Sequence, residues 1–239
     1  MSDSLSKNPF LDKKKVRSLF NSIASFYEIV NKVMSLGLDG GWRNKAVEYA
    51  YGLTLDVACG TGELSSRLSC SSRTKKVLAT DISEKMIKWG RKNKHFCKDV
   101  SFVVSDAENL PFKDEVFDTV STSFSLRNFE DRLKALNDMM RVIKPGGRFI
   151  ILDTLKPQMN KILYSLYKFY LMKVIPFLAG ILTGDRKSYE YMSKTILNFY
   201  TKDDIRKIIE SKGFEIEKIE DISFGIVNLI VARKFGDIN

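Results

Sequence analysis

Cysteine and histidine are scarce in this sequence of 239 residues. The three cysteines, Cys59, Cys70 and Cys97, form no Cys-x-x-Cys motif and leave one cysteine odd. We therefore expect neither a disulfide framework nor a metal site, and this cysteine usage fits a reducing cytoplasm best. The single histidine, His95, lies in the polar stretch RKNKHFCKD at a predicted helix end, where we expect it to be a surface residue.

Long apolar runs are also missing. The N-terminal stretch MSDSLSKNPFLDKKKVRSLF has no apolar core of the kind found in secretory signals, so no signal peptide is expected. The nearest approach to a membrane-spanning run is 162–183, which Lys168, Lys173 and Pro176 interrupt. This pattern argues against a spanning helix but is compatible with a helix that lies at a membrane interface.

Acidic residues are outnumbered, with 29 Asp and Glu against 39 Lys and Arg and a formal net charge of +10. Such a surplus favours acidic partners, either nucleic acid or an anionic membrane surface. No aromatic RNP pattern and no amide-activating string of the NPPY type accompanies it, so we do not expect nucleic-acid binding. The lysine run 13–15 is interpreted as a solvated helix face, with attraction to a membrane surface as the second interpretation.

Short β-rich runs alternate with helical patterns from about residue 53. The alternation predicts a mostly parallel sheet covered by helices on both faces, of the Rossmann-like α/β class. Two further runs around Gly225 predict an antiparallel hairpin at the sheet edge. The strands expected in this way are 53–59, 75–81, 100–106, 117–125, 148–155, EIEKIEDISF and GIVNLIVARKF.

We expect one domain, 1–239, in four segments. The helix after the apolar insertion should begin at the N-cap Thr201 and end at the C-cap Gly213. The insertion itself either completes the core or forms a lid with an apolar lining. The segments are an N-terminal helical lid at 1–50, a nucleotide-binding core at 53–155, a helical insertion at 157–200, and a C-terminal helix with edge strands at 201–235.

Polar residues follow three successive predicted strands. In DVACGTGE, Gly60 and Gly62 allow a sharp strand-to-helix turn and a close approach by a ligand. Asp81 closes the second strand, where an acid accepts hydrogen bonds from ribose hydroxyls. Asp106 and Ala107 close the third, placed for the amine and ring nitrogen of an adenine. These positions predict a nucleotide site at the carboxyl edge of the sheet.

The details favour S-adenosylmethionine (SAM) over a nicotinamide cofactor. Ser65 stands where the dinucleotide fingerprint has its third glycine, and no phosphate-binding P-loop is present. Asp56 precedes the glycine turn. An acid before the turn and acids after the next two strands suit a ligand that has an amino acid end and no pyrophosphate.

Several motifs together resemble the ubiquinone/menaquinone biosynthesis C-methyltransferases, the UbiE/MenG family, over residues 13–234. The SAM-binding strings are shared by many methyltransferases, whereas SFSLRN, the N-terminal YEIVNKVMSLG and the 188–205 stretch are more particular. The resemblance implies a seven-stranded SAM methyltransferase sheet and methyl transfer from SAM to a ring carbon of a polyprenylated hydroquinone. The motifs are FNSIASFYEIVNKVMSLGLDGGWR, LDVACGTGEL, DAENLPFKDEVFDTVSTSFSLRNFED, RVIKPGG and SYEYMSKTILNFYTKDDI.

The resemblance also implies roles for individual residues. Arg127 and Asn128 match the family's acceptor-side pair, and Tyr27 matches its N-terminal tyrosine. Two positions depart from the family pattern: Cys59 replaces a glycine, and Asp153 stands where the family usually has a glutamate. The implied SAM contacts are Thr61, Asp81, Asp106, Ala107 and Ser123, beside the turn residues Asp56, Gly60 and Gly62.

Carbon methylation requires an electron-rich ring, and loss of a hydroquinone proton provides one. The arginine guanidinium stays protonated, so Arg127 would hold the oxygen on which negative charge develops, or a water that relays the proton, while Asn128 fixes the geometry. We do not expect Arg127 to act as a general base.

The expected partners follow from this chemistry. The substrate is a prenylated hydroquinone, and the location is cytoplasmic with peripheral contact at the inner membrane face. A homodimer contact would fall in 10–50 or 157–200, which lie outside the sheet. The first alternative is a SAM-dependent methyltransferase for another small lipid-like or phenolic acceptor, such as a sterol or a tocopherol-type phenol. The others are a SAM-binding sensor without catalysis and a basic protein that methylates or merely binds RNA.

Overall fold

A seven-stranded mixed sheet forms the centre of the computed structural model, which describes residues 12–24, 27–184 and 186–236. Residues 1–11 of the predicted N-terminal lid lie outside the described residues. The strands are β1 Gly52–Val57, β2 Thr74–Asp81, β3 Val100–Val104, β4 Phe117–Ser123, β5 Ile143–Asp153, β6 Phe214–Ile222 and β7 Val227–Lys234.

The strand order is β3-β2-β1-β4-β5-β7-β6. The first five strands are parallel, and β7 runs antiparallel between β5 and β6. The order changes direction beside β1, and the carboxyl ends of β1 to β5 meet at one edge. This arrangement confirms the predicted Rossmann-like sheet with an antiparallel edge hairpin.

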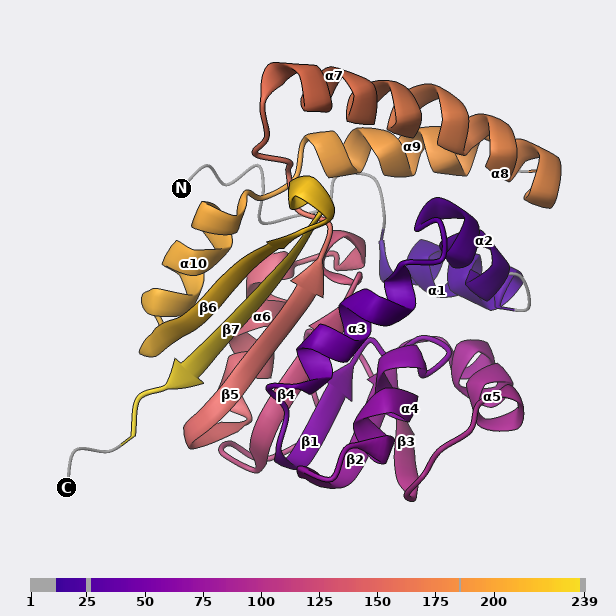
Figure 1. The fold of residues 1–239 in the computed structure, drawn as a ribbon. Coiled ribbons are helices and arrows are strands. Elements are labelled where there is room, and N and C mark those ends of the chain that lie inside the picture. The colour runs from indigo at the N-terminus through magenta and orange to yellow at the C-terminus, as the bar shows by residue number, and fades with distance from the viewer. Residues whose placement is uncertain (1–11, 25–26, 185, 237–239) are drawn as a thin grey trace.

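Helices cover both faces of the sheet (Figure 1). Several begin where a side chain caps the free backbone N–H groups: Ser83 caps α5, and Thr201 forms a capping box with Asp204 at α10, as predicted for Thr201. The sheet-covering helices are α3 Asp39–Val47, α4 Glu63–Cys70, α5 Glu84–Asn93, α6 Arg132–Arg141 and α10 Lys202–Glu210.

The predicted strands match the observed ones to within two residues at each end, except at the start of the fifth strand. The fifth strand begins at Ile143 rather than 148, because Ile143 pairs with Phe117 across a register shift that accommodates the KPGG segment. Helix α10 has its C-cap at Ser211, and Gly213 follows with a φ of +79° before β6 begins. The glycine therefore turns the chain into the strand instead of capping the helix.

A second group of helices lies at the carboxyl edge of the sheet. Figure 1 shows α7, α8 and α9 stacked above that edge, with α1 and α2 beside them. Val30 and residues of α7 to α9 share an apolar cluster separate from the sheet core. This group comprises α1 Lys13–Ile23, α2 Tyr27–Met34, α7 Lys161–Phe169, the π-helical turn Tyr170–Val174, α8 Ile175–Thr183 and α9 Arg186–Leu197.

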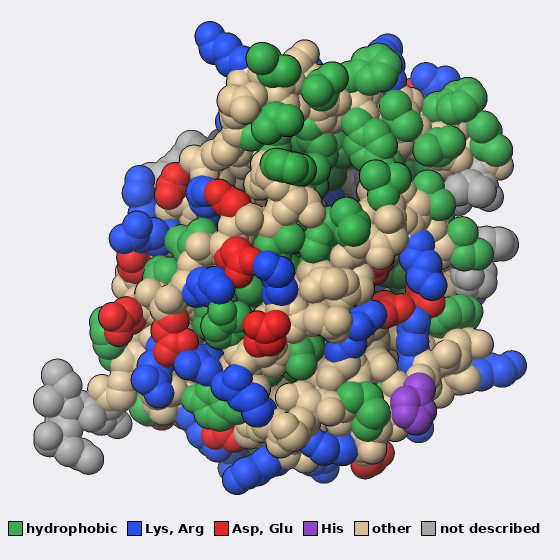
Figure 2. Space-filling model, viewed as in Figure 1, with side chains coloured by type: hydrophobic (Ala, Val, Ile, Leu, Met, Phe, Trp, Pro, Cys, Tyr) green, Lys and Arg blue, Asp and Glu red, His purple; other side chains and the backbone are tan. Residues whose placement is uncertain are grey.

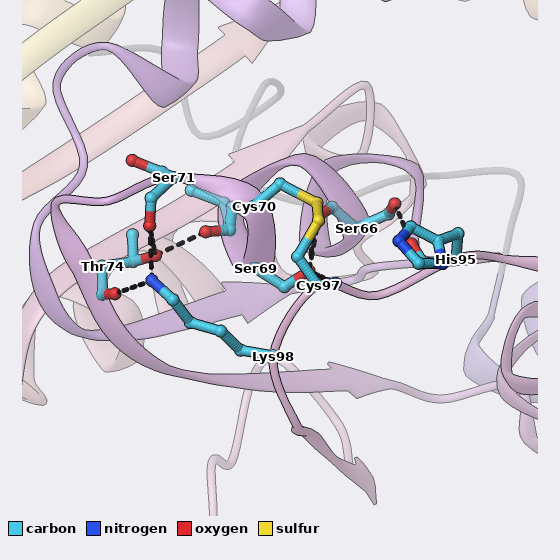
Figure 3. Close-up of a disulfide and its surroundings, with 9 residues drawn as sticks. Ser66, Ser69, Cys70, Ser71, Thr74, His95, Cys97 and Lys98 are labelled. Atoms are coloured by element: carbon cyan, nitrogen blue, oxygen red, sulfur yellow. Dashed lines mark hydrogen bonds between the residues drawn. A yellow bond between two sulfur atoms is a disulfide. The ribbon is translucent and has the colours of Figure 1, made fainter.

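A disulfide joins Cys70 to Cys97, which corrects the expectation of none (Figure 3). Cys70 ends α4, and Cys97 lies in the loop that leads to β3. The intervening β2 and α5 return the chain to the same point, so the two Cα atoms lie 4.8 Å apart despite a separation of 27 residues. Sequence spacing alone does not reveal this pairing. The third cysteine, Cys59, is free and buried.

Candidate active site

Two adjoining cavities open at the carboxyl edge of the sheet. The first is lined by residues at the ends of β1 to β4 and by α1. The second lies beneath α2 and the α7–α9 helices. The residues common to both linings are Phe20, Tyr27, Phe124 and Asn128. A group held in one cavity therefore faces a group held in the other at these four residues.

The glycine turn forms one wall of the first cavity. The Gly60 backbone N–H donates to Oδ2 of Asp81 at 2.8 Å, and the Ser83 N–H donates to Oδ1 at 2.8 Å. Burial raises the pKa of the Asp81 carboxyl, while these backbone hydrogen bonds oppose the rise. Gly60 and Asp81 line the cavity, and Gly62, with a φ of +78°, begins α4 as its N-cap.

Two of the predicted cofactor residues lie behind this turn. Asp56 and Thr61 are buried, and neither belongs to the lining of the two cavities. The Asp56 carboxylate accepts hydrogen bonds from Ser65 and Ser121. Burial raises its pKa to about 7, against the effect of both serines. Asp56 thus supports the turn from below.

The end of β3 carries an ion-pair cluster that the sequence did not predict. Asp106 and Ala107 line the first cavity, as does Ser123 at the end of β4. Nζ of Lys13 lies 2.6 Å from Oδ2 of Asp106 and 2.8 Å from Oε2 of Glu108. Lys13 is therefore not part of a solvated face, because the first turn of α1 lies over the end of β3.

The polar groups of the first cavity fit SAM. Asp81, predicted to bind a ribose diol, and Asp106, predicted to bind an adenine amine, both line this cavity. The Ser105 hydroxyl lines the cavity and is buried with no hydrogen-bond partner among the described residues, so a ligand could satisfy it. The cavity measures only about 70 Å³, well below the roughly 300 Å³ of small ligand sites, because α1 packs down onto it.

The acceptor-side pair follows β4 in a short 3-10 turn, Leu126–Asn128. Oδ2 of the buried Asp153 accepts hydrogen bonds from the backbone N–H groups of Ser125 and Leu126, at 3.0 and 2.9 Å. Nε of Arg127 lies 3.8 Å from Oδ1 of Asp153. Burial raises the pKa of Asp153, while Arg127 and these N–H groups lower it. The aspartate at the end of β5 thus fixes both the turn and the guanidinium.

The junction between the cavities contains strained backbone. Phe124 has a φ of +55°, which is uncommon for an aromatic residue and costs free energy. Its ring lies under the Arg43 guanidinium at 5.0 Å and beside Trp42. Tyr27 packs edge-on against Phe20, with ring centroids 5.9 Å apart. Aromatic side chains therefore surround the point where the two cavities meet.

The second cavity has a volume of about 650 Å³ and a mostly apolar lining. Arg127 and Asn128 lie in its wall on the sheet side. Tyr167 and Tyr170 form the wall on the insertion side, and burial raises the pKa of both. Neither tyrosine is among the site residues predicted from the sequence. Their three-residue spacing on an apolar helix was the available signal.

His95 and Cys59 are not among the site residues predicted from the sequence. His95 is exposed, as expected. Cys59 is buried, and burial together with the nearby Asp81 and Asp56 raises the pKa of its thiol. A thiol held protonated in this way is a poor nucleophile.

Comparison with known proteins identifies sequence relatives. The profile of the ubiE/COQ5 methyltransferase family matches residues 9–234. The demethylmenaquinone methyltransferase of Thermotoga maritima is 35% identical over 92% of this chain and 96% of its own length. The ubiquinone/menaquinone biosynthesis C-methyltransferase UbiE of Shewanella pealeana is 36% identical over 92% of this chain and 90% of its own.

Solved structures share the fold. A SAM-dependent methyltransferase of Thermotoga maritima, described as a possible histamine N-methyltransferase, superposes with a TM-score of 0.64 and 18% identity, covering 92% of this chain and 99% of that one. A methyltransferase in complex with the Trm112 activator of Haloferax volcanii superposes with a TM-score of 0.66 and 17% identity, covering 90% of this chain and 97% of that one. The sheet described above is therefore that of SAM-dependent methyltransferases.

Proposed function

The chain belongs to the ubiE/COQ5 methyltransferase family, and on that premise we propose that it transfers a methyl group from SAM to a ring carbon of a prenylated hydroquinone. The observation that carries this proposal is the place of Arg127 and Asn128. Both line the large apolar cavity, and Asn128 also lines the nucleotide-side cavity. A ring held by this pair faces the cofactor site.

SAM, when bound, supplies an electrophilic methyl group on a sulfonium. Asp81 and Asp106, at the ends of β2 and β3, would hold the nucleoside, and the Gly60 turn lines the same cavity. Ser123 lies at the end of β4 on the same cavity wall. The glycine turn would let the cofactor approach the backbone, and the free N–H groups at the N-terminus of α4 would favour its carboxylate.

Arg127 acts on the acceptor. Its guanidinium stabilises the oxygen anion that forms as the hydroquinone loses a proton, and electron density then rises on the ortho carbon. That carbon would bond to the methyl group as the methyl–sulfur bond breaks and a neutral thioether is released. The carbon then loses its own proton while the ring oxygen regains one, which restores the aromatic hydroquinone. Asn128 orients the ring, and Tyr27 closes the junction over the reacting atoms. Apolar walls exclude water and strengthen the charge interaction.

The lid segments complete the site. We propose that 1–50 and 157–200 act together as a lid on the core 53–155, with the apolar cavity between them for the ring and the first part of its prenyl chain. We further propose that the protein works in the cytoplasm at the inner membrane face, since quinols dissolve in lipid and SAM in water. If the protein forms a homodimer, the contact would involve the same segments.

The test is incubation of the purified protein with labelled SAM and either demethylated prenyl quinols or other lipid-like phenols, such as tocopherol-type phenols. Mass analysis of the lipid fraction should show one added methyl on the quinol ring carbon. Methylation of the other phenols in preference to the quinols would replace the proposed substrate with the alternative one. Absence of label in every lipid would contradict the proposal altogether.

A further inference from the structure

The helix formed by α7, the π-helical turn and α8 is apolar on the side that faces away from the protein. Five large side chains on this side are between 59% and 76% exposed. They recur at spacings of three to four residues, with the exposed Lys173 filling the gap between 169 and 177, so they form one continuous line. This outer stripe consists of Ile162, Leu166, Phe169, Phe177 and Ile181.

The opposite side of the same helix is apolar as well, but it is covered. Tyr167, Leu171 and Ile175 are buried against α2 and α9, and all three line the large cavity. A helix that is apolar on two opposite sides normally has both of them covered. Here only the inner side is enclosed by the described part of the chain. Figure 2 shows hydrophobic side chains gathered over α7 and α8 at the top of the molecule.

The charge on this surface has one sign. Lys161, Lys168 and Lys173 are exposed along the helix. Residues 154–184 contain no Asp or Glu. Lysine stems can lie along apolar groups while their ammonium groups reach the phosphates of a lipid surface. An apolar line with lysines and without acids thus complements a membrane that carries anionic head groups.

From these observations we infer that the outer stripe docks the protein on an anionic phospholipid bilayer, with the helix lying in the plane of the interface. The segment Lys161–Ile181 is long and apolar enough to cross a membrane by length and composition. Crossing would place Lys168 and Lys173 in hydrocarbon and would strip the large cavity of one wall. In an interfacial position the ammonium groups reach the lipid head groups, and the inner side of the helix stays packed against the protein.

A second copy of the chain fits the outer stripe less well than an anionic bilayer does. In a two-fold symmetric contact through the stripe, each residue faces the same surface of the partner. The three lysines of each copy would then meet an acid-free segment that also carries three lysines. Like charges brought together without counter-charges oppose association.

The docking surface also lies close to an opening of the large cavity. Helix α2 packs against α8, and its Ile29 is exposed. Leu36 and Leu38 follow α2, are exposed, and line the cavity. If the proposed function is correct, a prenyl chain could pass from the bilayer past these leucines without crossing water.

The experiment measures binding of the full-length protein to vesicles of phosphatidylcholine, with and without phosphatidylglycerol, by flotation. Wild-type protein should float with the anionic vesicles and much less with the neutral ones. The double variant Phe169→Ser with Phe177→Ser should lose about tenfold or more of its partitioning. The matched control is Phe235→Ser, because Phe235 is 60% exposed beyond the far end of β7 and should leave flotation unchanged.

The charge contribution has its own pair of variants. Lys168→Glu with Lys173→Glu should weaken binding to anionic vesicles about tenfold or more. Lys75→Glu with Lys76→Glu makes the same change of net charge at the amino end of β2, where both lysines are exposed, and should have little effect. Equal binding by all variants would overturn the inference, as would a lipid-free dimer that the stripe variants convert to monomer.

Failure of this inference can be told apart from failure of the proposed function. A tail-less, water-soluble hydroquinone should be methylated equally by wild-type protein and by the stripe variants. Only methylation of a prenylated quinol embedded in vesicles should fall in the variants. Absence of any methylation by wild-type protein would contradict the proposed function while leaving the vesicle-binding result to decide the docking surface.

Discussion

Lys13 forms an ion pair with Asp106, the carboxylate expected to receive the adenine amine, across 93 residues of sequence. Burial lowers the pKa of Lys13, but its hydrogen bonds with Asp106 and Glu108 outweigh burial and raise it overall. The α1 helix is thereby held over a cavity of only about 70 Å³. If Asp106 receives the adenine amine as proposed, the lysine and the nucleoside compete for one acceptor, and we expect α1 to shift when the cofactor enters.

We expect Lys13→Ala to bind SAM about two- to fivefold more tightly, since removal of a partly exposed ion pair changes the free energy by up to about 1 kcal/mol. Isothermal calorimetry with SAM measures this. Lys14→Ala is the control, because Lys14 is exposed and does not line the cavity. Unchanged or weaker binding by Lys13→Ala would show that the ion pair does not restrict the site.

Arg127→Ala should lower the rate of methyl transfer about a hundredfold or more, because it removes the positive group near the developing anion. SAM affinity should stay nearly unchanged, since Arg127 does not line the nucleotide-side cavity. Arg127→Lys keeps a charge near Asp153 and should recover part of the rate. Steady-state kinetics and calorimetry measure the two properties separately, and wild-type turnover by Arg127→Ala would exclude the role.

Asp153→Asn should slow methyl transfer between about tenfold and a hundredfold, because a displaced Arg127 no longer meets the ring oxygen. Asp153 lines neither cavity itself, and it acts by positioning the turn that begins at Ser125. The expected result is a lower kcat with little change in SAM affinity. A variant that loses SAM binding and stability together, with kcat preserved in the folded fraction, would indicate a purely structural residue.

The buried Asp56 should make stability fall as pH rises. Its pKa is about 7 in the folded protein and about 3.8 unfolded, so the folded state binds the extra proton between these values. The contribution of Asp56 to the free energy of unfolding is therefore greatest below about pH 4. It falls by roughly 4 kcal/mol by about pH 8. Asp56→Asn should remove this decline in urea unfolding measured across pH. Parallel curves for the two proteins would contradict the raised pKa.

Reduction of the Cys70–Cys97 disulfide should lower the free energy of unfolding by about 3 kcal/mol, because the bond closes a loop of the unfolded chain. SAM affinity should not change, since neither cysteine lines a cavity. Urea unfolding with and without dithiothreitol measures the effect, and Cys97→Ser should behave like the reduced protein. A reductant effect that persists in Cys97→Ser would assign the change to another group.

Much of the fold followed from local pattern. The alternation of strands and helices, the cap at Thr201 and the glycine turn at Gly60 depend on residues within a few positions of one another, where periodicity and backbone sterics decide the outcome. The same turn, with Asp81 and Asp106 after the next two strands, predicted a nucleotide site, and the structure brings these residues to one cavity because carboxyl ends of parallel strands meet at one edge. Family motifs added Tyr27 and the pair at Arg127 to that site.

Contacts between distant segments were decided by the tertiary structure alone. The sequence could not show that Lys13 reaches Asp106, that Cys70 meets Cys97, or that Tyr167 helps enclose a cavity with Arg127. It also could not show which side of α7 stays uncovered. Each of these depends on how whole helices pack at the sheet edge, and that packing is set by the sum of many weak apolar contacts rather than by any local pattern.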